Sequence, residues 1–332
     1  MTAPILSIII ISYNTREMTL ACIASVYAQT QTSFEVIVVD NASSDGSAKS
    51  IAAAYPDVTV RAETTNHGFA GAHHIAMAHA SAPWVLLLNP DTLVLDHALD
   101  KLVAFAEMRP AAGIWGGRTV FADGTLNPFS CWGRMTVWSL FCRTSGLTGV
   151  FSKSGLLNTE SFGDWPRDTE RTVDIVSGCL LLLKRQTWDD LGGLDPIFYM
   201  YGEEADLCLR AIAAGLQPMV SPTATIVHYG AASETVQADK VVRLLTAKVE
   251  LINRHFSPAK RGLGRHLLRL WPLSRAVALS VFGALTRRAP VRAKAGEWYQ
   301  VWARRAEWQD GFAPDIKSVA QLGGQPPRPP GI

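Results

Sequence analysis

The chain has 332 residues, a formal net charge of +2, 48% hydrophobic residues and 18% charged residues. This supply of apolar side chains excludes an intrinsically disordered chain, and the length fits one large domain or two. The five cysteines are scattered without a CxxC pair, which argues against a disulfide scaffold or a zinc ribbon and fits a reducing compartment.

Strand and helix signals alternate over the first 110 residues. The first apolar run has no basic segment before it and is too short for a signal peptide or a membrane span. Apolar runs predict strands at Leu6–Ile11, Phe34–Val39, Val58–Arg61 and Trp84–Leu88. Four helices are expected between and after these strands: from Thr15, after Gly46 to about Tyr55, after Gly71 to about Ala80, and from Asp96 to about Met108. In the first of them, Met18, Cys22, Ile23 and Val26 should face inward. This alternation predicts a mostly parallel sheet with helices on both faces.

The pattern is less regular after residue 110. A hairpin is expected at Asp123-Gly124, and a strand over Val173–Lys184 is interrupted at Ser177-Gly178. A helix begins near Glu203, with Leu207, Leu209 and Ile212 on its apolar side, and a last short strand covers Thr225–His228. We therefore expect one α/β domain over residues 1–238, with a regular part at about 1–110 and a less regular part at about 111–238.

The remaining sequence predicts a basic helical region over residues 239–312 and a disordered tail over 313–332. Residues 1–239 hold 14 basic and 24 acidic side chains, whereas residues 240–308 hold 15 basic and 3 acidic ones. Such a basic segment usually meets phosphate, in nucleic acid or at an anionic membrane surface. Pro272 should break or kink a helix, and the longest uncharged stretch, Ala276–Thr286, has 11 residues, about half of a membrane span. We expect a peripheral contact with the membrane surface, or a helical cap on the domain that precedes it.

Several polar side chains follow predicted strands at their carboxyl ends, where parallel sheets bind ligands. Asp40 could accept hydrogen bonds from a base or a ribose, or it could cap the next helix. Asp91, after Asn89-Pro90, could hold a divalent cation against a diphosphate, or it could belong to a turn. His228 could be a metal ligand at the same edge or a structural histidine.

Three carboxylates gather at the start of one predicted helix, in the segment FYMYGEEADLCLR. Helix capping would explain Glu203, Glu204 and Asp206, because a helix N-terminus stabilises anions. However, two adjacent acids rarely both act as caps, so one of them could take the proton of a sugar hydroxyl. Asp206 and Arg210 stand four residues apart and can form an ion pair within the helix.

Five blocks in this order resemble the family 2 glycosyltransferases, which are inverting enzymes with the GT-A fold. They are SIIIISYN at 7–14, VVDNASSDGS at 38–47, NHGFAG at 66–71, LLLNPD at 86–91 and GLDPIFYMYGEEADLCLR at 193–210 followed by His228, and they span about 70% of the chain. The pairing of NHGFAG with NPD is similar to the rhamnosyltransferase-type branch that builds bacterial surface polysaccharides. The resemblance implies an α/β fold of GT-A type: a Rossmann-like, mostly parallel mixed sheet flanked by helices, here with a basic helical C-terminal extension.

The resemblance implies that residues 1–238 are the catalytic domain, with a nucleotide-sugar half at about 1–110 and an acceptor half at about 111–238. It also implies roles for individual residues. Nucleotide-sugar contacts are implied for Ser12, Tyr13, Asn14, Asp40, Asn66, Gly68, Asn89 and Asp91. Asp91 and His228 would hold Mn²⁺ or Mg²⁺, and an imidazole ligand favours Mn²⁺. The acceptor side would be formed by Ser177, Gly178 and Glu203, and Glu204 would be the general base. The family's usual Glu-Asp pair is Glu203-Glu204 here, and Asn89 replaces a carboxylate. His73 and His74 lie in a helix next to the pocket and are expected to be exposed helix residues, with contacts to the donor or the acceptor as the alternative.

The implied reaction moves a sugar, rhamnose in this branch, from a nucleotide-diphosphate sugar to a hydroxyl of a lipid-linked or cell-surface glycan precursor. It would take place in the cytoplasm at the inner face of the cell membrane. A dinucleotide-binding oxidoreductase is excluded, because SYNTREM after the first strand lacks the glycines of G-x-G-x-x-G. The alternative that stays open is a non-catalytic protein that binds polyanions or nucleic acid through the basic region.

Overall fold

The computed structural model describes residues 3–230 and 237–312, which form two compact units. One unit comprises residues 3–132 and 166–230, and the other comprises residues 133–165 and 237–312. The sequence placed residues 133–165 in the acceptor half of the catalytic domain, whereas the structure groups them with the C-terminal helices. The predicted disordered tail, 313–332, lies outside the described residues.

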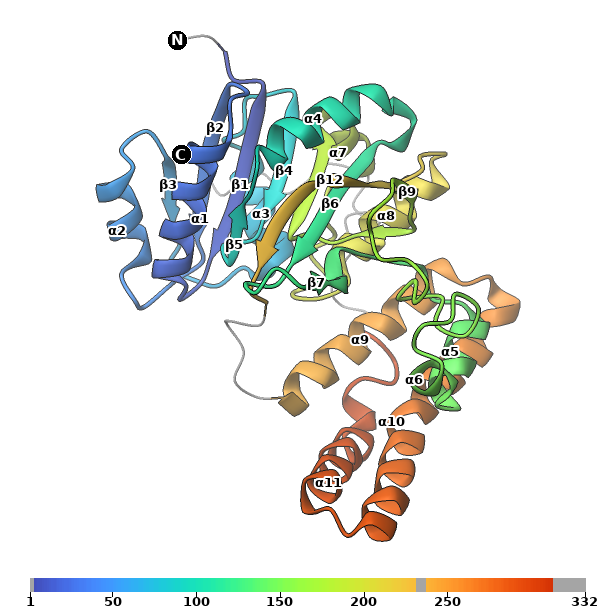
Figure 1. The fold of residues 1–332 in the computed structure, drawn as a ribbon. Coiled ribbons are helices and arrows are strands. Elements are labelled where there is room, and N and C mark those ends of the chain that lie inside the picture. Colours follow the sequence, from blue (N-terminus) through green and yellow to red (C-terminus); the bar gives the residue numbers. More distant parts are fainter. Residues whose placement is uncertain (1–2, 231–236, 313–332) are drawn as a thin grey trace. The chain divides into compact units, whose positions relative to one another are not determined.

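The first unit is built on a mixed sheet (Figure 1). Its mutually parallel strands are β1 (Leu6–Ser12), β2 (Phe34–Asp40), β3 (Thr59–Ala62), β4 (Trp84–Leu88), β6 (Ile114–Val120) and β12 (Met219–His228). Strands antiparallel to these are β5 (Thr92–Val94), β7 (Leu126–Asn127), β9 (Arg171–Thr172) and β11 (Leu180–Lys184). A separate antiparallel pair is formed by β8 (Cys131–Trp132) and β10 (Ile175–Val176).

The order of strands across the sheet is β3-β2-β1-β4-β11-β6-β12-β5. The parallel order β3-β2-β1-β4 confirms the arrangement predicted from the strand–helix alternation. Both β4 and β6 are antiparallel to β11 and are therefore parallel to each other, as β6 is to β12. The carboxyl ends of β1, β2, β4 and β12 thus lie at one edge of the sheet, which we call the carboxyl edge.

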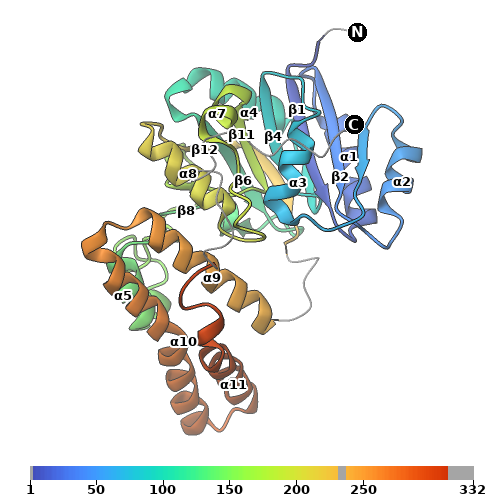
Figure 2. The ribbon, with the colours of Figure 1, turned by 180° about the vertical axis from the view of Figure 1, so that it is seen from behind.

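Helices cover both faces of this sheet, as Figures 1 and 2 show. They are α1 (Arg16–Gln29), α2 (Ser47–Ala54), α3 (Gly68–Met77), α4 (Ala98–Met108), α7 (Arg185–Leu191) and α8 (Glu203–Ala213), with the 3₁₀ turns η1 (Pro110–Ala112) and η2 (Pro128–Ser130). Helices α1 and α4 lie on one face, and α3, α7 and α8 lie on the other. Alternate strand residues such as Ile8, Val38 and Leu86 pack with Ile23 and Leu102 in the core between the sheet and the first face's helices.

Some local expectations were wrong. Met18 is exposed, because α1 turns Thr19 inward. Thr15 is the residue before α1, as predicted, but its hydroxyl lies 3.1 Å from the Thr19 hydroxyl and does not cap the helix. The residue before α4 is His97, not Asp96.

The second unit is helical. It contains α5 (Val137–Thr144), α6 (Leu147–Val150), α9 (Gln237–His255), α10 (Pro258–Thr286), α11 (Ala289–Ala303) and the 3₁₀ turn η3 (Arg305–Glu307). Leu140 from the inserted segment packs in one core with Leu245, Ile252, Leu268 and Trp308 from the C-terminal region. This shared core explains why residues 133–165 belong to the helical unit.

A buried ion cluster also ties the inserted segment to the C-terminal helices. Glu160 lies 2.6 Å from Arg143 and 3.6 Å from Lys248, and its carboxylate accepts a hydrogen bond from the Ser139 hydroxyl at 2.7 Å. Burial alone would raise the pKa of Glu160, but Lys248 and Arg143 outweigh it and hold this pKa below its usual value.

Pro272 does not break the C-terminal helix α10. The helix runs without a break from Pro258 to Thr286 with Pro272 inside it. Pro272 and the preceding Trp271 are buried, and this packing offsets the missing backbone hydrogen bond. By length and composition, α10 is apolar enough to cross a membrane, with a mean hydropathy of 1.2 in its best window.

Candidate functional site

Asp91 and His228 lie together at the carboxyl edge. The loop after β4 carries Asp91, and β12 ends at His228, which pairs in register with Thr92 on β5. The His228 Nε2 atom is 3.4 Å from Asp91 Oδ1, and the Tyr229 amide donates to the Asp91 carbonyl at 3.0 Å. The Asn89 side-chain amide lies 3.5 Å from His228 Nε2. Two residues far apart in the sequence thus meet as the sequence predicted.

The Asp91 carboxylate controls the charge of His228. Burial of the imidazole lowers its pKa, but the contact with Asp91 and the nearby Cys179 thiol outweigh burial and raise the pKa to about 10. Without a bound cation, His228 is therefore protonated at neutral pH and pairs with Asp91.

The distance between the Asp91 and His228 side chains is suitable for two ligands of one divalent cation. Ligand atoms about 2.1 Å from the same ion are separated by roughly 3 Å or slightly more, and Asp91 Oδ1 and His228 Nε2 are 3.4 Å apart. A carboxylate with an imidazole suits Mn²⁺. In residues 3–230 and 237–312, no cluster of three or more His, Cys, Asp or Glu side chains could hold a metal ion. Further ligands would have to come from a substrate.

The end of β1 and the loop after it show three different environments. The Ser12 hydroxyl, at the end of β1, is buried and lies 3.1 Å from the Thr19 hydroxyl, so it helps to hold α1. Tyr13 is exposed. Asn14 has a positive φ of 53°, and its side-chain oxygen accepts a hydrogen bond from the Ser44 amide at 2.8 Å. Asn14 therefore links the loops that follow β1 and β2.

Asp40, the last residue of β2, has an unused hydrogen-bond acceptor. The carboxylate is buried, and its Oδ1 atom has no hydrogen-bond partner in the described structure. A buried acceptor without a donor is costly. A ligand N–H or O–H at the carboxyl edge would satisfy it.

Asn41, which the sequence analysis missed as a site residue, organises the next loop. Its side chain donates to Asn66 Oδ1 at 2.9 Å and to the Gly68 carbonyl at 3.1 Å, and it accepts from the His67 amide at 2.8 Å. Asn66 also accepts from the Gly68 amide at 2.9 Å. Asn66 and Gly68 thus lie where α3 begins, beside the end of β2. The only signal in the sequence was the position of Asn41 in the VVDNASSDGS block.

Gly68 allows a close approach between two loops. Its φ is +69°, and a Cβ atom there would lie 2.3 Å from the Tyr199 carbonyl oxygen. The next amide, from Phe69, donates to this oxygen at 2.9 Å. The segment that leads into α8 is therefore fastened to the start of α3, and the N-terminus of α8 lies at the carboxyl edge.

The interruption at Ser177-Gly178 separates β10 from β11, as predicted. The Ser177 amide donates to the Ser130 carbonyl at 2.9 Å. A Cβ atom at Gly178 would lie 3.2 Å from the Phe69 ring. Gly178 therefore lies against the first turn of α3, close to the loop before α8.

The three carboxylates of α8 have distinct surroundings. Asp206 is buried and pairs with Arg210 at 2.7 Å, as the spacing predicted. Arg210 also donates to the carbonyls of Leu191 and Gly193, so this pair anchors the preceding loop. Glu203 is buried and its Oε2 atom has no hydrogen-bond partner, while Glu204 is only half-buried.

Both glutamates hold a proton more tightly than an exposed carboxyl. Burial, followed by the neighbouring Glu204, raises the pKa of Glu203 well above its usual value. Burial also raises the pKa of Glu204. Two adjacent carboxyls with raised pKa values at a sheet edge are typical of proton-transfer sites.

The histidines of α3 are structural. The expectation that His73 and His74 are exposed was wrong: His73 is buried and its Nδ1 lies 2.8 Å from the Phe69 carbonyl oxygen, and His74 Nε2 lies 2.6 Å from the Leu194 carbonyl oxygen. Burial lowers the pKa of His73 to about 4, so it is neutral at physiological pH.

Asn127 is a second residue that the sequence analysis missed. Buried at the end of β7, its side-chain amide donates to the His228 carbonyl at 3.1 Å and its oxygen accepts from the Phe129 amide at 3.0 Å. It therefore holds the backbone of His228 against η2. An asparagine after a hairpin carries no signal in a single sequence that distinguishes it from a turn residue.

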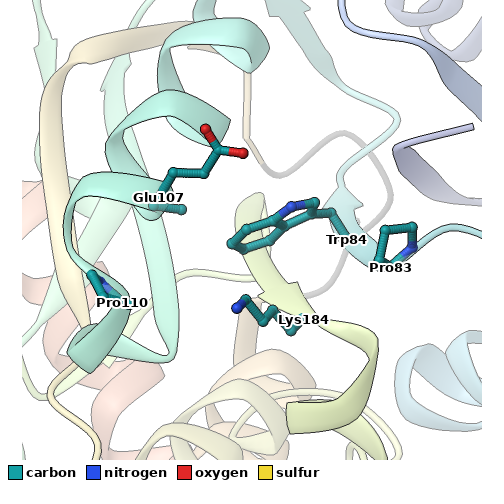
Figure 3. Close-up of a pocket in the computed structure, with 6 residues that line it drawn as sticks. Pro83, Trp84, Glu107, Pro110 and Lys184 are labelled. Atoms are coloured by element: carbon teal, nitrogen blue, oxygen red, sulfur yellow. The ribbon is translucent and has the colours of Figure 1, made fainter.

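A cavity of about 370 Å³ lies away from this site (Figure 3). Its walls include Trp84 at the start of β4, Lys184 at the end of the antiparallel β11, and Glu107 near the end of α4. These positions mark the edge of the sheet opposite the carboxyl edge. The cavity therefore does not contribute to the site of Asp91, His228 and Glu204.

Comparison with known proteins agrees with this geometry. Residues 7–156 match the family model "Glycosyl transferase family 2". The chain is 26% identical over 240 residues to N-acetylglucosaminyl-diphospho-decaprenol L-rhamnosyltransferase of Mycobacterium tuberculosis, covering 69% of this chain and 77% of that protein. It is also 26% identical over 172 residues to rhamnosyltransferase WbbL of Escherichia coli, covering 49% of this chain and 61% of that one. A non-catalytic polyanion-binding protein finds no support among these relatives.

A solved structure shares the fold. The mannosyltransferase PcManGT from Pyrobaculum calidifontis, solved in complex with GDP-Man and Mn²⁺, aligns with a TM-score of 0.57 at 18% identity and covers 93% of this chain and 88% of that one. The fold is therefore of the GT-A type, with a C-terminal helical extension. From the family 2 match over residues 7–156 and these relatives, the chain is a glycosyltransferase.

Proposed function

We propose that this protein transfers a sugar from a nucleotide-diphosphate donor to an acceptor hydroxyl with inversion at the anomeric carbon. The observation that carries the proposal is the joint position of two groups at the carboxyl edge. Asp91 and His228 form a pair suited to a cation and a diphosphate, and α8 brings Glu204 to the same edge as a proton acceptor.

The donor would lie along the ends of β1, β2 and β4. Asp40 offers a buried acceptor to the base or the ribose, with Tyr13 exposed beside it and Asn14 fixing the loop. Further contacts to the nucleotide-sugar are assigned to Asn66, Gly68 and Asn89. The Ser12 hydroxyl supports α1, so we assign Ser12 only an indirect part in this pocket.

Asp91 and His228 would hold Mn²⁺ or Mg²⁺, and the neighbour PcManGT was solved with Mn²⁺. Held there, such an ion would supply positive charge to offset that of the departing diphosphate. Before binding it, His228 must give up the proton that the Asp91 carboxylate stabilises.

Glu204 would take the proton of the acceptor hydroxyl while that oxygen attacks the anomeric carbon from the face opposite the diphosphate. A base in this role needs access to the acceptor. The half-buried Glu204 has that access, whereas Glu203 is buried and Asp206 is engaged by Arg210. Glu203, Ser177 and Gly178 would line the acceptor side.

Rhamnose is the proposed donor sugar, and a lipid-linked glycan or polysaccharide precursor is the proposed acceptor. The relatives named above are an L-rhamnosyltransferase acting on N-acetylglucosaminyl-diphospho-decaprenol and a rhamnosyltransferase of Escherichia coli. A lipid-linked acceptor fits a location in the cytoplasm at the inner face of the cell membrane. The basic C-terminal region would bind the anionic membrane surface there.

A panel of nucleotide-sugars tests this proposal. The melting temperature of the full chain, measured with Mn²⁺ and each nucleotide-sugar, should rise most with a nucleoside-diphosphate rhamnose, since only a ligand of the folded state raises it. Incubation of that donor with a polyprenyl diphospho-N-acetylglucosamine should then yield a disaccharide whose new linkage has the anomeric configuration opposite to the donor's. A product that retains the donor's configuration would refute the single displacement.

A further inference from the structure

Helix α10 has two parts with different surroundings. In the part up to Ala276, the side chains of Leu268, Trp271 and Ala276 are buried in the helical unit. From Val277 to Thr286 the helix is almost entirely exposed, with Gly283 buried against α11. This exposed end of α10 and the first turns of α11, residues 277–294, form what we call the hairpin tip.

The hairpin tip presents apolar side chains on one side of the helix. Val277 is 54% exposed, Val281 55%, Phe282 51% and Leu285 79%. Their spacing of four, five and eight residues from Val277 places them along one stripe of an α-helix. In a soluble monomer, large apolar side chains gathered on an exposed stripe mark an interaction surface.

Cations adjoin this stripe. Arg287, Arg288, Arg292 and Lys294 are all exposed, and residues 276–296 contain no Asp or Glu. In the described structure none of these four side chains has a carboxylate within ion-pair distance. Unpaired cations beside an apolar stripe complement an anionic lipid surface, where the apolar residues enter the boundary between headgroups and acyl chains.

The packing of α10 argues against a full crossing. Two arginines of α10 lie over tryptophan rings of α11. Arg275 is 5.1 Å from the centre of the Trp298 ring, and Arg269 is 5.9 Å from the centre of the Trp302 ring. Arg143 from the inserted segment covers Trp271 at 5.1 Å. The first part of α10 is thus covered by protein and cations. The exposed end of α10 from Val277 to Thr286 is ten residues long and reaches about 15 Å, half of a hydrocarbon core of about 30 Å.

We propose that the hairpin tip is the membrane-binding element of this protein, inserting Val277, Val281, Phe282 and Leu285 into one leaflet of an anionic bilayer. This inference rests on the proposed membrane location of the enzyme but assigns it to a particular segment. It predicts insertion into one leaflet only, with the rest of the helical unit outside the hydrocarbon.

Co-sedimentation of the full chain with vesicles tests the proposal. The parent should bind phosphatidylcholine vesicles containing phosphatidylglycerol, bind pure phosphatidylcholine vesicles at least tenfold more weakly, and lose affinity as salt rises. The double variant F282Q/L285Q should lose at least tenfold in affinity. The matched control is L263Q, because Leu263 is a 51% exposed residue of the same helix outside the tip. Equal loss in L263Q, or parent-like binding by F282Q/L285Q, would overturn the assignment.

A site-specific probe distinguishes insertion from a surface contact. The five native cysteines are buried, so L285C can be labelled selectively with an environment-sensitive fluorophore. The proposal expects a blue shift with anionic vesicles and accessibility of the label from the vesicle exterior only. Accessibility from the lumen would mean that the helix crosses the membrane, and that outcome would refute the one-leaflet model.

Two further outcomes would contradict the proposal that the hairpin tip binds the membrane. If F282Q/L285Q changes a dimer into a monomer while vesicle binding is unaltered, the stripe is an interface between two copies of the chain. The thermal shift with nucleotide-sugar and Mn²⁺ is measured in parallel on the same samples. A donor shift without vesicle binding would remove this inference and leave the proposed glycosyl transfer standing.

Discussion

At the scale of single residues, the choice of the general base depends on differences among neighbouring carboxylates. The Glu204→Gln variant keeps the size and hydrogen bonding of the side chain but cannot accept a proton. We expect turnover to fall about 10²–10⁴-fold with little change in donor affinity. Glu204→Asp should keep partial activity. Steady-state kinetics combined with donor titration would check both variants.

The matched control for this experiment is Glu203→Gln. Parent-like turnover in Glu204→Gln together with an inactive Glu203→Gln would move the role of base to Glu203. Loss of donor binding in Glu204→Gln would instead assign that residue to the donor pocket. Because the pKa of Glu204 is raised, the acidic limb of the parent's pH–rate profile should lie above the range of an ordinary glutamate.

Glu203 should make the folded state sensitive to pH. Its pKa is raised by burial, so the folded chain binds more protons than the unfolded chain above the usual glutamate pKa of 4.5. The free energy of unfolding must then fall as the pH rises through that window. Glu203→Gln removes the titration and should flatten this dependence, raising the melting temperature more at pH 8 than at pH 5. A parallel decline in both proteins would show that Glu203 is not its source.

The Asp91–His228 pair predicts a coupling between proton and metal. The His228 pKa of about 10 means that Mn²⁺ must displace a proton, so its affinity in the presence of nucleotide should rise with pH. Asp91→Ala should weaken nucleotide-sugar binding in Mn²⁺ and hardly change it in chelator. Calorimetry with and without Mn²⁺ would measure both effects. Equal metal-dependent affinity in the variant and the parent would exclude Asp91 as a ligand.

At the scale of elements, η2 is fastened to the end of β12 through Asn127. The Asn127→Ala variant removes both side-chain hydrogen bonds, to His228 and from Phe129. We expect a several-fold higher Mn²⁺ requirement for half-maximal activity, with kcat at saturating Mn²⁺ close to the parent's. Asn127→Asp should not rescue a positional effect of this kind, because it keeps the acceptor for Phe129 but loses the donor to the His228 carbonyl. A lower kcat at unchanged Mn²⁺ requirement would contradict the positioning role.

The junction between α3 and the loop before α8 depends on Gly68. Gly68→Ala would place a Cβ atom 2.3 Å from the Tyr199 oxygen in a backbone conformation with φ +69°. Overlap with a backbone atom and a left-handed φ together should cost at least 1–2 kcal/mol of stability. Chemical denaturation would measure this loss. Gly46→Ala is the control, since φ is also positive there but no atom lies within 4 Å of the added carbon.

At the scale of the whole molecule, the sequence predicted the first half of the sheet more fully than the rest. Buried parallel strands such as Ile8–Ile11 are continuous apolar runs, and their parallel direction follows from the helices that connect them. The short strands β5, β8 and β9 carry two or three residues each, too few for a periodic signal. The grouping of residues 133–165 with the C-terminal helices depends on long-range packing of side chains such as Leu140.

The candidate site, too, could be predicted from the sequence only in part. The meeting of Asp91 with His228 and the pair between Asp206 and Arg210 followed from strand ends and helical spacing. The roles of Asn41 and Asn127 could not be predicted in this way, because each acts through hydrogen bonds to backbone atoms distant in the sequence. The burial of His73 was also missed, since a histidine on a helix can face either water or a sheet.

The insertion of residues 133–165 into the helical unit has a consequence for how the chain is made. During synthesis on the ribosome, this segment emerges before β12 and well before α9 and α10, which supply its core partners and the Lys248 that pairs with Glu160. Until then Leu140 has no core to enter and Glu160 lacks one of its two cations. In a chain shortened before α9, Leu140 would never gain its core partners and Glu160 would never gain Lys248. Deleting the C-terminal helices therefore does not isolate an intact catalytic domain, and point variants are the sounder way to separate the two units' contributions.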